Sequence, residues 1–255
     1  MEMLELKKEI YENKGYSLRY KLCPNELVKL RSLVEEQFLQ NISKHYPNYL
    51  ELFKSAGIEN YHLHSHLVDH SKIWPKLSRC LAQNACNEIK EMNFFKTLTN
   101  DFSPFQLGRV VYEREVVWEW DEMYWRIVRP HQPGDVGTLH ADKWFHDCMK
   151  IRERVFPKGA NALKIWIPLY CEAGKNGLEV VEGSHHKNWD FRIEDIENTY
   201  KPRLNCEESQ IERTLLSTEP GEMVIFNEDL VHVGAVNEGS TTRISLEITL
   251  IRTLC

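Results

Sequence analysis

The period of the hydrophobic residues changes between residues 98 and 109, and this change constrains the fold more than any other feature of the chain. Residues 25–98 repeat apolar side chains at steps of three and four, which is typical of amphipathic helices. Residues 109–253 contain short runs rich in valine, isoleucine, tryptophan and tyrosine, separated by Pro-Gly, Asn-Gly and Glu-Gly-Ser turns. Many short strands joined by turns indicate a sandwich, barrel or jelly roll rather than βαβ units.

The expected elements follow from these patterns. A helix is predicted within residues 25–42, with Asn25 as its N-cap and apolar residues on one face. A second helical stretch is predicted over residues 73–98, with Pro75 tolerated in its first turn. Strands are expected in six segments, which are 109–120, 123–130, 162–170, 178–183, 222–227 and 243–251.

The two parts are expected to form a single domain over residues 1–255, with residues 1–100 mostly helical and residues 109–253 forming the β core. No repeat, low-complexity tract or Pro/Gly/Ser-rich linker separates them. A formal net charge of −6 and a pI near 6.0 argue against a nucleic-acid partner and favour a small molecule. The charged segment 1–15 lacks the apolar stretch of a signal peptide, and no run is apolar enough for a membrane span, so a cytoplasmic protein without a membrane partner is expected.

One short motif suggests a metal site. His140 and Asp142 are two residues apart, so on an extended segment their side chains project from the same face and one ion can contact both. By itself the motif is weak evidence, because roughly 0.4 such matches arise by chance in a chain of this composition.

A second pair of residues, His232 and Arg243, makes the prediction of a metal site more specific. His232 and Arg243 are symmetric about a turn at residues 237–239, so a regular hairpin would make them cross-strand neighbours with Cβ atoms about 5 Å apart. Two adjacent cations repel, unless the imidazole is neutral and metal-bound while the guanidinium binds a carboxylate. Two histidines and one carboxylate on a metal with open positions are the facial triad of non-haem Fe(II) oxygenases.

With these residues the chain resembles the phytanoyl-CoA dioxygenase family of 2-oxoglutarate-dependent oxygenases. The matching segments occur in the order GTLHAD, KIWIPLY, NGLEVVEGSHH, PGEMVIFNEDLVH and RISLEI. The chain departs from the family at Glu182, where proline is usual, and in a basic insertion at residues 148–159. The resemblance implies a mainly β fold with a double-stranded β-helix core, that is a cupin-like jelly roll, and with N-terminal helices packed on one side.

The resemblance also implies a site and a reaction. It assigns the Fe(II) ligands to His140, Asp142 and His232, and the binding of 2-oxoglutarate to Arg243, Trp166 and Ser245. The expected reaction uses O₂ to hydroxylate a small-molecule metabolite, with release of succinate and CO₂. Asp142 favours oxygen transfer, because related halogenases lack this carboxylate and bind chloride in its place.

The substrate contacts are expected near the ligands. Trp144, Phe145 and His146 follow the HxD motif and are predicted to face the substrate, and residues 143–160 are predicted to cover the pocket. Positive charge that would favour an anionic substrate is expected from Arg126, Lys143 and Arg129, although a solvated charged face is the alternative for each. The sequence does not specify an oligomeric state.

Other interpretations of the chain remain. His62, His64 and His66 alternate and could line one face of a strand as a second metal site, or point into the substrate pocket or into water. A metal-dependent jelly-roll protein could instead catalyse a non-redox reaction such as epimerisation or hydrolysis. It could also bind 2-oxoglutarate as a sensor without turnover, although the intact set of metal ligands argues against a sensor.

Overall fold

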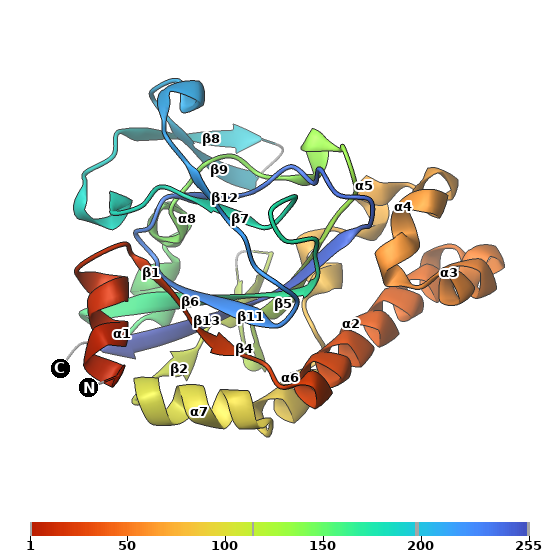
Figure 1. Ribbon diagram of the computed structural model, residues 1–255, viewed down its shortest axis with the longest axis horizontal. Helices are drawn as coiled ribbons and strands as arrows, with labels where there is room; N and C mark the ends of the chain where they lie inside the picture. The colour runs from red at the N-terminus through yellow and green to blue at the C-terminus, as the bar shows by residue number, and fades with distance from the viewer. Residues whose placement is uncertain (1, 114, 197–198, 254–255) are drawn as a thin grey trace.

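Two antiparallel β-sheets face each other in the computed structural model, which describes residues 2–113, 115–196 and 199–253 (Figure 1). The larger sheet has the order β1 (Tyr16–Lys21), β11 (Glu222–Asn227), β6 (Ala160–Tyr170), β13 (Arg243–Thr253) and β2 (Gln106–Leu107), and β5 (Met123–Val128) also pairs with β13. The smaller sheet has the order β10 (Thr214–Leu216), β7 (Leu178–Val180) and β12 (His232–Gly234). This arrangement confirms the predicted jelly-roll core.

Apolar side chains fill one part of the space between the sheets. The larger sheet contributes Tyr16, Trp166, Val224 and Phe226, and the smaller sheet and its loops contribute Leu178, Val180, Leu216 and Leu230. Burial of these side chains holds the two sheets face to face.

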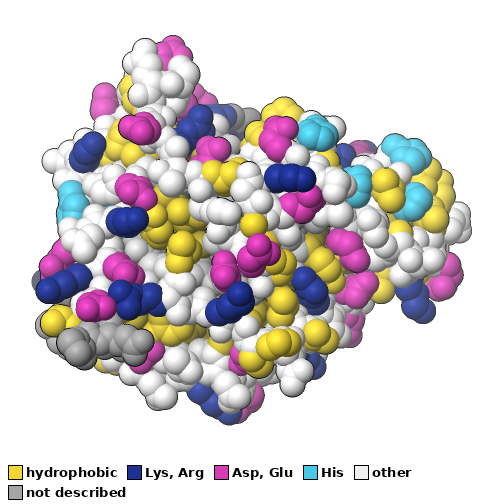
Figure 2. Space-filling view, viewed as in Figure 1, with side chains coloured by type: hydrophobic (Ala, Val, Ile, Leu, Met, Phe, Trp, Pro, Cys, Tyr) yellow, Lys and Arg dark blue, Asp and Glu magenta, His cyan; other side chains and the backbone are white. Residues whose placement is uncertain are grey.

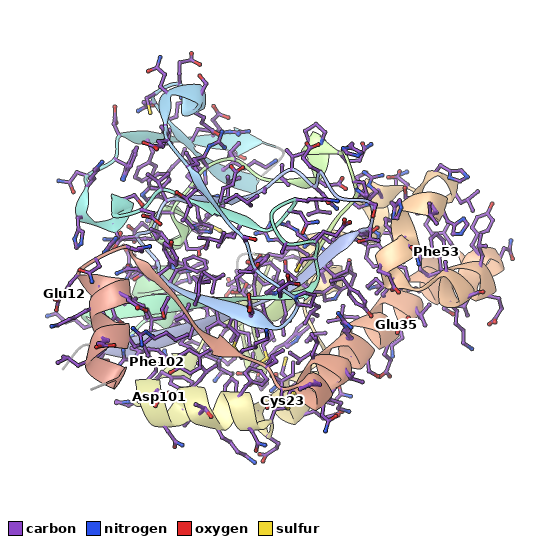
Figure 3. The ribbon with its side chains drawn as sticks, in the orientation of Figure 1. Glu12, Cys23, Glu35, Phe53, Asp101 and Phe102 are labelled. Carbon is purple, nitrogen blue, oxygen red and sulfur yellow. The ribbon has the colours of Figure 1, made fainter. Side chains whose placement is uncertain are left out.

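The predicted N-terminal helices cover the outer face of the larger sheet, as expected. Helices α2 (Pro24–His45), α6 (Gln83–Lys90) and α7 (Asn93–Phe102) have apolar faces that join one core with β5, β6 and β13. The other helices of this part are α1 (Glu2–Tyr11), α3 (Leu50–Ala56), α4 (Tyr61–His64) and α5 (His70–Ile73). Figure 3 shows the side chains of Phe53 on α3 and Phe102 at the end of α7, and both are fully buried.

Strand β13 has two chemically different faces. Its apolar residues Ile244, Leu246, Ile248 and Leu250 pack against the helices. The alternate residues Arg243, Ser245, Glu247 and Thr249 face the opposite way, into the space between the sheets. The same strand therefore builds the core on one face and presents polar groups to the interior of the jelly roll on the other.

Two helix predictions need correction. The N-cap of α2 is Cys23 rather than Asn25, because Pro24 takes the first helical position and the Glu26 carboxylate accepts a hydrogen bond from the Cys23 N–H at 3.0 Å. The stretch 73–98 is not one helix. It contains the end of α5 at Ile73, a 3₁₀ turn at Lys76–Arg79, and then α6 and α7, because Pro75 cannot continue the hydrogen-bonding pattern of α5.

Several strands differ from the expected set. Strand β1 lies in the part predicted to be helical and pairs with β11. The segment 109–120 is a hairpin of β3 (Arg109–Tyr112) and β4 (Glu115–Asp121), and a further hairpin, β8 (Phe191–Ile196) with β9 (Thr199–Leu204), was not predicted. Among the described residues, no helix combines the length and the hydropathy needed to cross a bilayer.

Candidate metal centre

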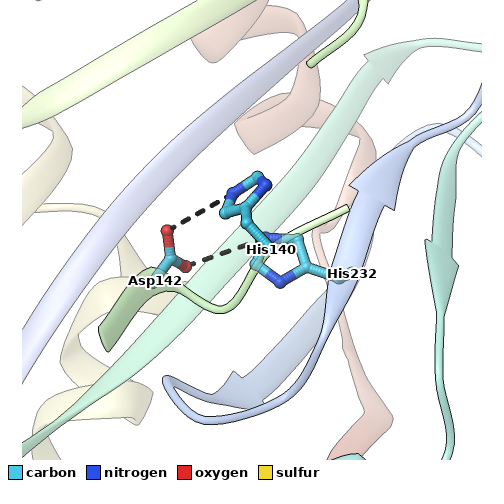
Figure 4. A group of neighbouring side chains, drawn as sticks. All are labelled: His140, Asp142 and His232. Carbon is cyan, nitrogen blue, oxygen red and sulfur yellow. Dashed lines mark ion pairs between the residues drawn. The ribbon is translucent and has the colours of Figure 1, made fainter. Parts of the chain in front are cut away.

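Three side chains converge at one edge of the smaller sheet (Figure 4). His140 forms an isolated β-bridge with His232 through two backbone hydrogen bonds of 3.0 and 2.8 Å. Asp142 begins helix α8 (Asp142–Cys148). Its carboxylate oxygens lie 4.0 Å from Nε2 of His140 and 3.8 Å from Nε2 of His232. One ligand atom of each residue lies within 4.8 Å of the others, so the three can hold one metal ion.

The local structure around the motif differs from the extended segment that was predicted. His140 lies on a bridge and Ala141 is the N-cap of a helix, so Asp142 projects from a helix start rather than from a strand. The two side chains still meet, because the chain bends at Ala141 toward the ion position. The convergence that the spacing predicted is present, but its geometric reason is different.

Hydrogen bonds orient both imidazole rings. Nδ1 of His140 lies 2.6 Å from the Thr138 carbonyl oxygen, and Nδ1 of His232 lies 2.9 Å from the Leu230 carbonyl oxygen. Each Nδ1 therefore donates to a backbone carbonyl, which leaves Nε2 as the acceptor that points toward the other ligands. This is the tautomer that a metal ion requires.

The protonation states also suit a metal. Burial, with repulsion from His232, lowers the pKa of His140 to about 4, so its ring is neutral at physiological pH. Burial alone would raise the pKa of Asp142, but neighbouring positive charge, first of all that of Lys164, outweighs it and keeps that pKa below its usual value. Oδ2 of Asp142 is buried without a hydrogen-bond partner among the described residues. Two imidazoles whose Nε2 atoms face an ionised, unsatisfied carboxylate form a donor set that fits a divalent transition metal such as Fe(II).

Arg243 reaches the same region by a route that the sequence did not predict. Strands β12 and β13 are not a hairpin, because β12 pairs with β7 in the smaller sheet while Arg243 lies opposite Val128 of β5 in the larger sheet. The Arg243 side chain instead crosses the interior and donates from Nη1 to the Gly177 carbonyl oxygen. His232 and Arg243 therefore share a pocket across two sheets.

The Arg243 guanidinium is suited to bind an anion. The residue is 1% exposed, no carboxylate among the described residues pairs with it, and its Nε has no hydrogen-bond partner there. Burial, with the neighbouring charge of Arg126, lowers its pKa to about 10, so it remains charged at neutral pH. The Ser245 hydroxyl is also buried and unpartnered among the described residues, and the Trp166 ring centre is 5.9 Å from the guanidinium carbon. A buried cation without a counter-ion is costly, so a bound carboxylate would stabilise this end of the pocket.

One cavity joins the two groups. It is lined by Arg126, Asp135, Val136, Gly137, His140, Trp166, Leu178, Phe226, His232, Gly234, Arg243 and Glu247. His140, His232, Arg243 and Trp166 thus border one space, as the sequence suggested.

The residues that follow the HxD motif do not line this cavity. Lys143 pairs with Asp229 at 3.3 Å on the surface, and the ring of Trp144 stacks on Phe191 at 4.6 Å. His146 lies 3.1 Å from the Glu228 carboxylate. None of these three is among the residues that line the cavity, so their role as substrate contacts stays a prediction. The Phe145 ring, in contrast, lies 5.0 Å from the His140 ring.

The insertion is held against the core and does not cover the cavity. Glu228 accepts hydrogen bonds from His146 of α8, from Arg152 of α9 (Ile151–Val155) at 2.6 Å, and from the Ala162 N–H at 2.8 Å. No residue of 143–160 is among those that line the cavity. Of the predicted positive charges, only Arg126 borders the space, since Arg129 is paired with Asp135 at 2.7 Å.

The alternating histidines are not on a strand. His62 and His64 lie on α4, and His66 lies on a 3₁₀ turn at Ser65–Leu67. Nδ1 of His62 is 3.0 Å from the Thr242 hydroxyl. Figure 2 shows histidines gathered at this end of the molecule, but among the described residues only His140, Asp142 and His232 bring three such donors together.

Sequence reasoning missed the two acidic residues that line the cavity. Glu247 was read only as part of a strand, although the polar residues at 243, 245, 247 and 249 form a period of two that indicates a polar interior face. Asp135 lies in a turn and had no motif to identify it. Glu182, the departure from the family pattern, accepts a hydrogen bond from the Tyr16 hydroxyl at 2.6 Å and so ties β1 to the loop after β7.

Comparisons with known proteins agree with this geometry. The sequence model of the phytanoyl-CoA dioxygenase family matches residues 22–245. No curated protein matches the chain.

Similar solved structures share the fold at low sequence identity. AviO1 from Streptomyces viridochromogenes Tue57 is 12% identical with a TM-score of 0.56, and the match covers 98% of this chain and 95% of that one. The non-heme monooxygenase ThoJ, in its apo form, is 13% identical with a TM-score of 0.55, over 98% of this chain and 76% of that one. The epimerase SnoN, in complex with Fe³⁺, alpha ketoglutarate and nogalamycin RO, is 13% identical with a TM-score of 0.56, over 98% of this chain and 83% of that one.

Proposed function

Because this chain belongs to the phytanoyl-CoA dioxygenase family, we propose that it is a non-haem Fe(II)- and 2-oxoglutarate-dependent oxygenase that hydroxylates a small molecule. The observation that carries the proposal is the placement of two chemically complementary groups on one cavity. His140, Asp142 and His232 offer three converging metal donors, and Arg243 offers an unpaired buried cation. Among the described residues, Oδ2 of Asp142 and Nε of Arg243 are buried without a hydrogen-bond partner.

Each residue has a role in this proposal. His140, Asp142 and His232 hold Fe(II), while Arg243 and the Ser245 hydroxyl bind the distal carboxylate of 2-oxoglutarate beside the Trp166 ring. Iron with 2-oxoglutarate bound supplies the oxidising chemistry with O₂ and releases succinate and CO₂. The protein positions the co-substrate, and the apolar walls formed by Leu178 and Phe226 keep water from it.

An anaerobic titration tests the proposal. Fe(II) and 2-oxoglutarate together should give a weak visible charge-transfer band in the wild-type protein, and His232→Ala should abolish it. Lys143→Gln, which alters a surface cation outside the cavity, should leave the band unchanged. In air the wild type should release succinate slowly even without added substrate, and absence of both signals would rule out this function.

A second outcome of the same site is epimerisation. The structurally similar SnoN is described as an alpha ketoglutarate dependent epimerase, so the fold also supports a reaction that inverts a carbon centre. Both reactions would consume 2-oxoglutarate here, whereas a hydrolase would not. Once a substrate is known, a gain of one oxygen atom in its mass identifies the hydroxylase, and an unchanged mass with altered stereochemistry identifies the epimerase.

A further inference from the structure

Arg126 is a second arginine in the cavity, and it is held differently from Arg243. It lies on β5 opposite Ser245, so its side chain and that of Arg243 are diagonal neighbours on the interior face of the larger sheet. Its Nε donates to the Glu247 carboxylate, which also accepts a hydrogen bond from the Tyr124 hydroxyl, and its Nη2 lies 3.2 Å from that hydroxyl. Glu247 and Tyr124 therefore fix one edge of the guanidinium.

The other edge of Arg126 is available. No described residue accepts a hydrogen bond from its Nη1, and the side chain keeps 35% of its surface although the residue lines the cavity beside His140 and Glu247. Arg129 on the same segment is a useful contrast, because Asp135 accepts hydrogen bonds from its Nε at 2.8 Å and its Nη2 at 2.7 Å on two different oxygens. Arg126 has no such two-point partner, so it can still bind an oxyanion.

The charges around the cavity leave one positive charge uncompensated. Arg126, Arg243 and Lys164 are cations, and Asp142 and Glu247 are anions. The cavity residue Asp135 is compensated by its ion pair with Arg129 at 2.7 Å. Fe(II) and the 2-oxoglutarate dianion would add equal and opposite charge. Lys164 is 4% exposed, and its Nζ lies 2.9 Å from the Thr249 hydroxyl. An uncompensated charge in a pocket is unfavourable. The site with Fe(II) and 2-oxoglutarate bound should therefore favour the binding of one further negatively charged group.

We propose that the free edge of Arg126 binds an acidic group of the substrate, a carboxylate or a phosphate, so that the enzyme acts on a small anionic molecule. This inference rests on the proposed function, because it takes iron and 2-oxoglutarate to occupy the other cationic end of the cavity. Glu247 and Tyr124 act as positioning residues that hold Arg126. The acidic group would lie on the opposite side of Arg126 from Glu247.

Binding of simple anions near the metal tests the proposal without knowledge of the substrate. The protein is loaded with Mn(II), which accepts the same ligands, and with saturating 2-oxoglutarate. Acetate or inorganic phosphate is then titrated, and relaxation of the acetate ¹H or phosphate ³¹P signal by the paramagnetic ion reports binding close to the metal. The two probes separate a carboxylate site from a phosphate site.

The expected result is saturable relaxation of at least one probe in the wild type. Arg126→Gln should weaken that binding about 10- to 100-fold, the effect of losing charged hydrogen bonds. Lys143→Gln should bind as the wild type does. Tyr124→Phe removes a hydroxyl that holds Arg126 and should weaken binding by less than Arg126→Gln does, which provides a second test if Arg126→Gln does not fold.

Three results would overturn the inference. They are no saturable relaxation in the wild type, unchanged binding in Arg126→Gln, and loss of the Fe(II)–2-oxoglutarate band in Arg126→Gln. The last result would place Arg126 in the co-substrate site. Failure of the proposed function is distinct, because it would remove that band from the wild type itself.

Discussion

The guanidinium of Arg243 lies directly against Gly234, so a Cβ at Gly234 would come within 3.1 Å of Nη2 and 3.4 Å of Nη1. Gly234 is two residues after His232 on β12. The missing side chain at this position is what lets an arginine from the larger sheet reach the region of a ligand in the smaller sheet.

Gly234→Ala should therefore weaken 2-oxoglutarate binding by displacing Arg243. We expect about a fivefold loss of affinity, equivalent to about 1 kcal/mol for a distorted charged hydrogen bond, with unchanged metal affinity. The intensity of the Fe(II)–2-oxoglutarate band against 2-oxoglutarate concentration measures it. Gly137→Ala is the matched control, because Gly137 lines the same cavity but a Cβ there would meet nothing within 4 Å. Equal affinities in the two variants would contradict the role of Gly234.

Replacing Arg243 should separate charge from geometry. Arg243→Lys keeps a cation but loses the planar fork, so 2-oxoglutarate affinity should fall about 10-fold, and Arg243→Met should lower it further. Arg252→Met changes the same residue type at the far end of β13, where Nη1 bonds the Tyr11 hydroxyl, and should leave this affinity unaltered. If Arg243→Met binds 2-oxoglutarate normally, the anion site lies elsewhere.

Glu228 should stabilise the segment that carries Asp142. Glu228→Ala leaves His146 and Arg152 without their shared partner, and we expect a loss of about 3 kcal/mol in the free energy of unfolding. Metal affinity should also fall, because α8 begins at Asp142. Asp229→Ala is the control, since its pairing with Lys143 is at the surface and should be worth less than about 1 kcal/mol. Urea unfolding and a Co(II) titration measure the two effects, and similar values for both variants would refute this role.

The buried His140 and the partly buried His70 should make the metal-free protein less stable at acidic pH. Burial is the main cause that lowers the pKa of both His140 and His70 from 6.5 to about 4. Below about pH 6.5 the unfolded chain therefore binds protons that the folded protein does not, and the free energy of unfolding falls as the pH falls toward 4. The slope is at most about 1.4 kcal/mol per pH unit for each histidine.

Urea unfolding of the metal-free protein between about pH 7 and pH 5 measures this dependence. His70→Gln removes one of the two groups and should reduce the slope while leaving the metal ligands in place. A free energy of unfolding that does not change over this range would show that neither histidine is held neutral by the fold.

Much of the fold followed from local patterns. The strands β5, β6, β7, β11 and β13 were predicted because each is a run of β-favouring residues bounded by turn signals. Strand β1 was not, because YSLRYK is short and its pairing with β11 joins residues about two hundred positions apart. The second helical stretch is interrupted at Pro75, between the end of α5 and the start of α6. The sequence pattern did not show this break, because proline is also tolerated in the first turn of a helix.

The sequence indicated which residues lie near one another, but not the strands and helices that bring them together. Residue types that favour metal and carboxylate binding identified His140, Asp142, His232 and Arg243. The structure brings the first three together and places His140, His232 and Arg243 on one cavity, while the roles of all four stay predictions. The hairpin argument failed because β12 and β13 enter different sheets, which only tertiary pairing decides. Asp142 likewise begins a helix, and neither Trp144 nor His146 is among the residues that line the cavity.

The two-faced pattern of β13 links correct assembly to catalysis. A shift of its register by one residue would place Ile244 in the cavity and bury Arg243 among the helices, so the error would lose both the hydrophobic core and the anion site. A misassembled chain would therefore be unstable as well as inactive. Cellular quality control recognises exposed apolar surface, so it would also remove the chains in which the Arg243 site is misassembled.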